Sequence, residues 1–141
     1  MSTFSKSYES RISEIRSDVG IVSSFDETDD SNRPMFSALW DTGANMSAIS
    51  SHVAQTLNLA PISYVSMETA NGRCEVPLYI IDLMLPGGNS VKRVKVIGIN
   101  MDVCDALIGM DVITMGDFLL TNAPNTKFEF RIPSIGAPPL A

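Results

Sequence analysis

Residues 38–45 read Ala38-Leu39-Trp40-Asp41-Thr42-Gly43-Ala44-Asn45, so that a single carboxylate follows an apolar run and precedes a hydroxyl and a glycine. An ionised carboxylate at the end of a buried strand is costly unless it is hydrogen bonded or shares a proton. Thr42 supplies a hydrogen-bonding side chain, and Gly43 lets the backbone approach closely enough to donate its N–H to Asp41. The same three residue types also form ordinary turns, so the tripeptide alone favours a tight turn.

Composition narrows the classes of protein to which this chain can belong. Its 141 residues, 45% of them hydrophobic and 18% charged, fit one folded domain. The formal net charge of -6 argues against nucleic-acid and anionic-membrane partners. The polar start predicts no signal peptide, and no apolar run approaches the roughly 20 residues that span a bilayer. Cys74 and Cys104 form neither a metal-ligand spacing nor a disulfide framework, so we expect a cytoplasmic protein with reduced thiols, no cofactor and no metal.

Breaks in the chain divide it into three parts. We expect residues 1–34 to be an N-terminal segment with an acidic loop at 26–34 that contributes an edge strand. Residues 35–132 form the main domain, and residues 133–141 a loosely ordered, proline-rich tail. Short segments of β-forming residues predominate, which predicts a mostly β fold with one or two short helices. The expected strands cover 8–22, 35–40, 64–69, 74–85, 91–99, 105–109, 118–121 and 127–132, and the expected helices cover 50–58 and 110–115.

A hairpin signal lies between the third and fourth of these strands. Asn71-Gly72 separates two extended runs, and this dipeptide is the strongest short-range indication of a two-residue turn. The sequence therefore predicts a type I′ turn, which needs a positive φ at both central residues.

Other kinds of site have little support. The chain has no phosphate-binding glycine motif, no zinc-protease helix motif and no Gly-x-Ser-x-Gly motif. His52 is the only histidine, so a thiol hydrolase would have to pair it with Cys74 or Cys104. Both thiols are more often ordinary small apolar residues, and this interpretation stays open only as an alternative.

Three features read together carry a resemblance. Asp41-Thr42-Gly43 follows an apolar strand, the Asn71-Gly72 hairpin comes some thirty residues later, and Leu107-Ile108-Gly109 ends a strand downstream. Over roughly residues 35–132 the chain resembles the retropepsin-like aspartic proteases, a family of single-domain retroviral, cellular and bacterial enzymes. The resemblance implies their closed β-barrel, with one lobe of the enzyme in each chain.

The resemblance also implies roles for individual residues. Asp41 is the catalytic acid. Active-site support falls to Thr42, Gly43, Leu107, Ile108 and Gly109. In the family, an acidic or amide residue often follows the apolar-apolar-Gly segment by two positions, and Asp111 stands there in this chain. Substrate binding falls to Ala44 and Asn45 and to a flap at Thr69, Ala70, Asn71 and Gly72. The chain departs from retroviral flaps in having one glycine at the tip, and Trp40 stands where a smaller aliphatic residue is usual.

A mechanism of this type requires two carboxylates, and the chain carries one Asp-Thr-Gly. We therefore expect a homodimer in which Asp41 of each copy faces the other across a two-fold axis. The expected substrate is an extended peptide or unfolded protein, with apolar side chains near Trp40, Ile49, Met67 and Ile108. The alternative is a catalytically inactive dimer of the same fold that binds peptide or serves assembly.

Overall fold

The computed structural model describes residues 2–26 and 33–132, and these form mostly β-structure. The strands are β1 (Ser2–Ser7), β2 (Ile15–Ser23), β3 (Met35–Trp40), β4 (Ala48–Ser50), β5 (Ser63–Thr69), β6 (Gly72–Met84), β7 (Ser90–Ile99), β8 (Ala106–Ile108), β9 (Asp117–Thr121) and β10 (Lys127–Ile132). The helices are α1 (Ser51–Thr56) and α2 (Met110–Ile113), and a 3₁₀ turn, η2, covers Pro86–Gly88. Most of the acidic loop expected at 26–34 and all of the tail expected at 133–141 lie outside the described residues.

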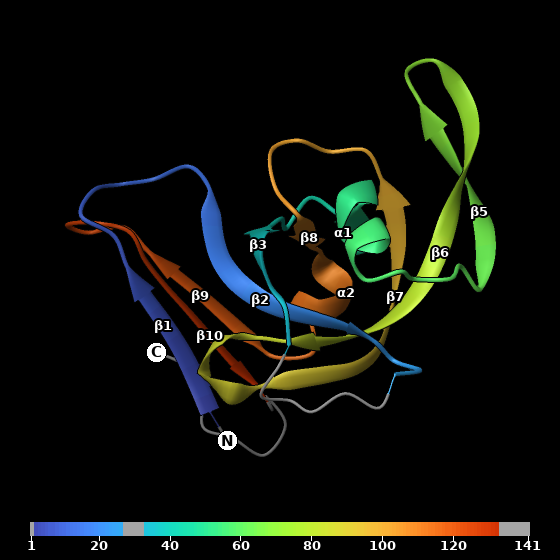
Figure 1. The fold of residues 1–141 in the computed structure, drawn as a ribbon. Coiled ribbons are helices and arrows are strands. Elements are labelled where there is room, and N and C mark those ends of the chain that lie inside the picture. The colour runs from blue at the N-terminus through green and yellow to red at the C-terminus, as the bar shows by residue number, and fades with distance from the viewer. Residues whose placement is uncertain (1, 27–32, 133–141) are drawn as a thin grey trace.

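Seven strands form a curved sheet in the order β2-β3-β8-β4-β7-β6-β5. β2 also pairs with β6, Gly20 facing Met84 and Ser23 facing Ile81, so the sheet closes on itself (Figure 1). Two of the pairings, β3 with β8 and β4 with β7, are parallel, which brings distant parts of the chain side by side. The predicted mostly β fold with short helices is confirmed.

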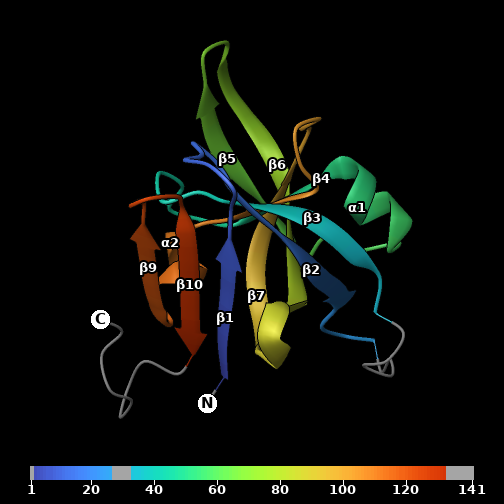
Figure 2. The ribbon, with the colours of Figure 1, turned by 90° about the vertical axis from the view of Figure 1, so that its left-hand side faces the viewer.

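A second, antiparallel sheet has the order β1-β10-β9, and its strands lie side by side in Figure 2. The sequence did not predict β1, whose residues are polar apart from Phe4. The strand expected from residue 8 begins only at Ile15. The Tyr8 N–H donates to the Thr126 carbonyl at 3.0 Å, and the Tyr8 hydroxyl donates to the Arg16 carbonyl at 3.2 Å. The N-terminal segment is therefore part of both sheets.

The main core fills the space between the two sheets. Trp40 is 5% exposed and packs its indole ring on Phe128 and Phe130, with ring centroids 5.0 and 4.9 Å apart. Its Nε1–H donates a 2.8 Å hydrogen bond to the hydroxyl of buried Ser17. Trp40 thus lies inside the barrel and not on the floor of a cleft, which corrects the expectation that it contacts substrate.

The hairpin of β5 and β6 projects from the barrel (Figures 1 and 2). Thr69 pairs with Gly72, so the two residues at its tip are Ala70 and Asn71. Gly72 has φ 108°, whereas Asn71 is not among the non-glycine residues with positive φ. The predicted type I′ turn is therefore wrong. The geometry matches a hairpin loop in which a glycine with a left-handed φ directly follows the turn and forms a β-bulge.

Asp82 anchors a second bulge, where Lys92 and Arg93 of β7 together face it. Its Oδ1 accepts hydrogen bonds from the Arg93 N–H at 3.0 Å and from the Ser24 hydroxyl at 2.7 Å, and Oδ2 lies 3.5 Å from Lys92 Nζ. Burial by itself raises the pKa of Asp82, but the two hydrogen bonds and the Lys92 charge outweigh it, so the pKa is lowered.

We expect Asp82→Asn to destabilise the fold by about 1–3 kcal/mol at neutral pH, since hydrogen bonds to a charged group are lost. A carboxyl whose pKa is lower in the folded than in the unfolded state stabilises the fold at pH values above its ordinary pKa of 3.8. This contribution is lost as the pH falls through the pKa of the folded state. Urea unfolding at several pH values should therefore show the difference between variant and wild type shrinking below about pH 4. Exposed Asp18→Asn is the control; a difference independent of pH would contradict this prediction.

Candidate active site

Asp41 lies at the end of β3, where its parallel pairing with β8 stops. Trp40 is in register with Ile108, and the Asp41 N–H donates a 2.8 Å hydrogen bond to the Ile108 carbonyl. The side chain is half-buried, while Thr42 and Gly43, which follow it, are exposed. The chain thus presents the carboxyl group at the boundary between the core and solvent.

Gly43 donates its N–H to Asp41 Oδ1 at 2.9 Å, which confirms the contact expected from the tripeptide. A Cβ on Gly43 would lie 3.2 Å from this oxygen, so a larger residue would crowd the carboxylate. Asp41 Oδ2 has no hydrogen-bond partner within residues 2–26 and 33–132. One oxygen is therefore held by the backbone and the other is available to a ligand.

A network of hydrogen bonds ties the Asp41 loop to the start of α2. Ser47 donates its N–H to Asp111 Oδ2 at 3.0 Å and its hydroxyl to Asp111 Oδ1 at 2.7 Å. The same hydroxyl accepts the Gly109 N–H at 2.9 Å, and the Ala44 carbonyl accepts the Met110 N–H at 2.8 Å. The sequence pointed to Asp111 only through the family pattern, and it did not predict Ser47. The sequence feature that could have pointed to Ser47 is its hydroxyl side chain, six residues after Asp41.

Gly109, at the end of β8, lies against the backbone of the loop that carries Asp41. A Cβ at this position would lie 2.8 Å from the Ala44 carbonyl oxygen and 3.0 Å from the Met46 carbonyl carbon, and both atoms are backbone. Neither atom can move aside as a flexible side chain could, so only glycine fits without displacing the loop that carries Asp41.

We expect Gly109→Ala to destabilise the fold by about 1–3 kcal/mol, because overpacking displaces backbone. The same displacement should lower any activity that depends on the position of Asp41. Urea unfolding monitored by circular dichroism measures the first effect. Asn45→Ala, an exposed change in the same loop, is the control and should leave stability unchanged. Equal unfolding curves for Gly109→Ala and wild type would contradict this prediction.

The structure brings only some of the predicted site residues together. Ile108 is fully buried in the main core, whereas Leu107, its neighbour on β8, points to the other side of the sheet. Thr42 and Asn45 are exposed and have no side-chain partner among the described residues. The hairpin tip is exposed, and there the Thr69 hydroxyl donates to the Gly72 carbonyl at 2.8 Å.

An apolar cluster lines the side of the sheet to which Leu107 points. Its half-buried members come from the Asp41 loop, the hairpin, the end of β7, the segment that follows β7, and β8, and they are Met46, Val65, Met67, Ile99, Met101 and Leu107. Next to it, a cavity of about 430 Å³ is bordered by Met67, Thr69 and Cys74 of the hairpin. Of the four apolar residues expected near substrate, only Met67 belongs to this surface. Trp40, Ile49 and Ile108 are at most 5% exposed and belong to the main core.

The cysteines and the histidine do not form a catalytic pair. Burial raises the pKa of the Cys104 thiol, which disfavours the thiolate that a thiol hydrolase needs. Cys74 is exposed on the hairpin, and His52 forms no hydrogen bond with either thiol in the part of the chain that the structure describes. Within the same residues, no three His, Cys, Asp or Glu side chains gather as metal ligands, and neither α-helix has the length or hydropathy to cross a membrane.

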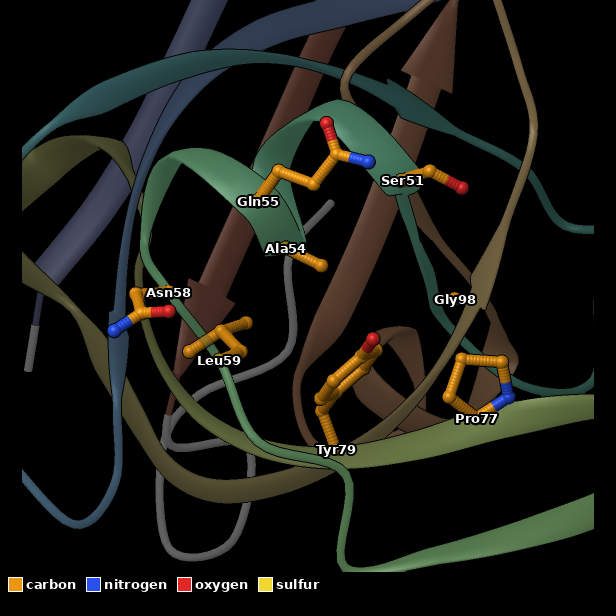
Figure 3. Close-up of a pocket in the computed structure, with 8 residues that line it drawn as sticks. All are labelled: Ser51, Ala54, Gln55, Asn58, Leu59, Pro77, Tyr79 and Gly98. Atoms are coloured by element: carbon orange, nitrogen blue, oxygen red, sulfur yellow. The ribbon is translucent and has the colours of Figure 1, made fainter.

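A second pocket of about 350 Å³ lies between α1 and β6, and none of the predicted site residues borders it (Figure 3). The Tyr79 ring forms one wall, and Gly98 leaves room for it, because a Cβ there would lie 2.8 Å from the ring. Burial and the neighbouring Tyr64 raise the pKa of Tyr79, so its phenol stays neutral. This pocket is separate from the loop that carries Asp41.

Comparisons with known proteins find similarity to aspartic proteases. Residues 31–115 match the family described as gag-polyprotein putative aspartyl protease. The chain is similar to the crystal structure of a retropepsin-like aspartic protease from Rickettsia conorii, with 17% identity, a TM-score of 0.63 and coverage of 91% of this chain and 92% of the other. It is also similar to EIAV protease complexed with the inhibitor HBY-793, with 15% identity, a TM-score of 0.52 and coverage of 72% and 86%. No curated protein matches. The likenesses show the retropepsin-like fold.

Proposed function

Because the chain belongs to the gag-polyprotein putative aspartyl protease family, we propose that it is an aspartic endopeptidase whose active site forms between two copies. Asp41 of each copy supplies one of the two carboxylates. The observation that carries this proposal is the geometry of Asp41, whose Oδ1 accepts the Gly43 N–H while Oδ2 lacks a partner in the described ranges. The chain holds no second Asp-Thr-Gly, so the other carboxylate must come from another molecule.

The two carboxylates would act on a water and a peptide carbonyl. Like charges at short range cannot both ionise comfortably, so the pair holds one proton. The ionised carboxylate takes a proton from water, whose oxygen attacks the carbonyl carbon while the protonated carboxyl donates to the carbonyl oxygen. Collapse of the tetrahedral intermediate then breaks the C–N bond as a proton passes to the leaving nitrogen. The position of the shared proton makes the two identical residues act differently.

We propose that the substrate is an extended peptide or an unfolded protein. Backbone recognition by strand addition suits a projecting hairpin, and the half-buried methionines and Leu107 offer an apolar surface to side chains near the cleaved bond. The hairpin has one glycine, Gly72, directly after its tip. There the Thr69 hydroxyl donates to the Gly72 carbonyl, and the exposed Arg73 side chain lies 3.5 Å from Glu68 across the strands. Thr42, Ala44 and Asn45 would contact the second copy or the substrate.

The test is a cleavage assay on unfolded protein from mildly acidic to neutral pH, with the mass in solution measured in parallel. The expected result is cleavage that requires a dimer and is stopped by an inhibitor that mimics the tetrahedral intermediate. A wild-type dimer that binds peptide without cleaving it would favour the alternative of an inactive binding module. Cleavage by a monomer would contradict the shared site.

A further inference from the structure

The pocket between α1 and β6 contains a buried tyrosine. Tyr79 is 8% exposed, and its ring lies against Gly98, where a Cβ would come within 2.8 Å of it. Its hydroxyl points toward α1 in Figure 3 and forms no hydrogen bond within residues 2–26 and 33–132. Buried tyrosine hydroxyls usually have a partner, so an unpaired one that borders a cavity indicates a ligand that binds there.

The other polar groups that border this pocket can donate hydrogen bonds without carrying a charge. Gln55 of α1 and Asn58, which follows the helix, are exposed, and their carboxamides have no hydrogen-bond partner in the part of the chain that the structure describes. Ser51, in contrast, already donates its hydroxyl to Asn100 Oδ1 at 2.7 Å. The apolar part of the wall comes from Ala54, Leu59 and Pro77. The pocket therefore suits an apolar ligand that is rich in hydrogen-bond acceptors.

An aromatic surface continues from the pocket along the base of the hairpin. Tyr64 of β5 lies directly opposite Pro77 of β6, so both side chains share a face of the sheet with Tyr79. Tyr64 is 60% exposed, and Ile62, two residues before it, is 42% exposed. Burial, and then the nearby Tyr64, raise the pKa of Tyr79, so its phenol stays protonated and can donate. Apolar and aromatic side chains gathered beside a pocket are typical of a surface that binds a partner.

We propose that this pocket and the surface beside it bind a proline-rich segment of another protein. Proline has no N–H, so such a segment in the polyproline II conformation presents carbonyl acceptors that it cannot satisfy itself. Its rings pack on aromatic side chains, and its conformation is largely fixed before binding, which lowers the entropic cost. The hairpin-base surface offers the matching rings and donors, and it consists of Gln55, Asn58, Ile62, Tyr64, Pro77 and Tyr79.

The lack of charge at the pocket decides between classes of ligand. None of the eight residues that line it in Figure 3 is charged. A phosphate, a carboxylate or an amine would lose its hydration there without gaining an opposite charge, which is costly. Binding of a neutral segment should also change little with salt concentration, because screening weakens only interactions between charges. An affinity that falls steeply with salt would contradict the proposal.

The hairpin-base surface lies beside the hairpin but apart from the loop that carries Asp41. Ser51, Pro77 and Gly98 border both this pocket and the cavity next to the hairpin. A bound segment would therefore lie near the proposed substrate cleft without touching the proposed catalytic residue. Asp41→Asn should bind the segment as wild type does, so docking and cleavage can fail independently of each other.

The test is a titration of the whole chain, isotope-labelled, with a short oligoproline peptide, monitored by NMR. We expect the amide signals of α1, Tyr79 and Gly98 to shift, whereas a glycine-serine peptide of equal length should shift none of them. Tyr79→Phe keeps the ring and removes the hydroxyl, so it should weaken binding about 3–10-fold, the effect of one hydrogen bond. Tyr64→Ala should weaken it at least about fivefold. Met115→Ala, which removes an apolar side chain that is 51% exposed at another cavity, is the matched control.

Two results would overturn the proposal and leave the proposed function standing. One is an oligoproline titration without shifts at the pocket, or with an affinity that both tyrosine variants leave unchanged while circular dichroism shows them folded. The other concerns the chain's own Pro138-Pro139, which lies outside the described residues. Changing both prolines to alanine should leave the signals of Tyr79 and Gly98 in place. Shifts there without any added peptide would assign the pocket to the chain's own C-terminal sequence.

Discussion

Asp41→Asn is expected to abolish peptide cleavage while leaving the fold and the dimer intact. Asparagine has the same shape, and its side-chain oxygen can still accept the Gly43 N–H that now binds Oδ1. It cannot take a proton from water, and loss of a general base lowers rates by about 10²–10⁴-fold at least. Cleavage of an unfolded protein at fixed dimer concentration measures the loss. Asp18→Asn, which changes an exposed aspartate of β2, is the matched control.

A mixing experiment separates a shared site from one that each chain completes alone. If both carboxylates are needed, dimers of one wild-type and one Asp41→Asn chain are inactive. Activity should then fall as the square of the wild-type fraction once subunits have exchanged. A linear fall would mean that each chain works by itself, and undiminished cleavage by pure Asp41→Asn would exclude Asp41 as the catalytic acid.

Local features of this fold could be predicted because they depend on neighbouring residues. The strand that ends at Trp40 follows from its apolar run, and α1 follows from its spacing and from Ser50, whose hydroxyl caps it by accepting the Val53 N–H at 3.1 Å. Asn58, where the helix expected at 50–58 ends, has a left-handed φ of 52°. In each case the residues that determine the local structure lie within a few positions of it in the sequence.

Features that depend on distant partners could not be predicted. Ser47 and Asp111 are 64 residues apart, and neither residue shows in the sequence which partner it will meet. β1 is polar and short, and it becomes a strand because it pairs with β10, which lies 120 to 130 residues away in the sequence: Ser7 pairs with Lys127 at one end and Ser2 with Ile132 at the other. The hairpin tip was misjudged by one residue, since the pairing of Thr69 with Gly72 decides which residues turn.

Trp40→Ala is expected to destabilise the protein by about 3–5 kcal/mol, the usual cost of removing a buried aromatic side chain. The sequence suggested that this residue contacts substrate, whereas the structure places its ring among Phe118, Phe128 and Phe130. Such a loss is a large part of the stability of a domain of this size, so much of the variant should be unfolded and inactive. Urea unfolding at one fixed protein concentration measures it, because dimerisation makes stability depend on concentration.

Trp40→Phe distinguishes packing from hydrogen bonding. It keeps an aromatic ring in the core but leaves the buried Ser17 hydroxyl without the 2.8 Å bond from Nε1, at a cost of about 1–3 kcal/mol. Adding Ser17→Ala removes the orphaned hydroxyl and should recover part of that loss, which a double-mutant cycle measures. If Trp40→Ala instead keeps the stability of wild type and changes which peptides are cleaved, Trp40 belongs to the substrate cleft. The packing described for β9 and β10 against it would then be wrong.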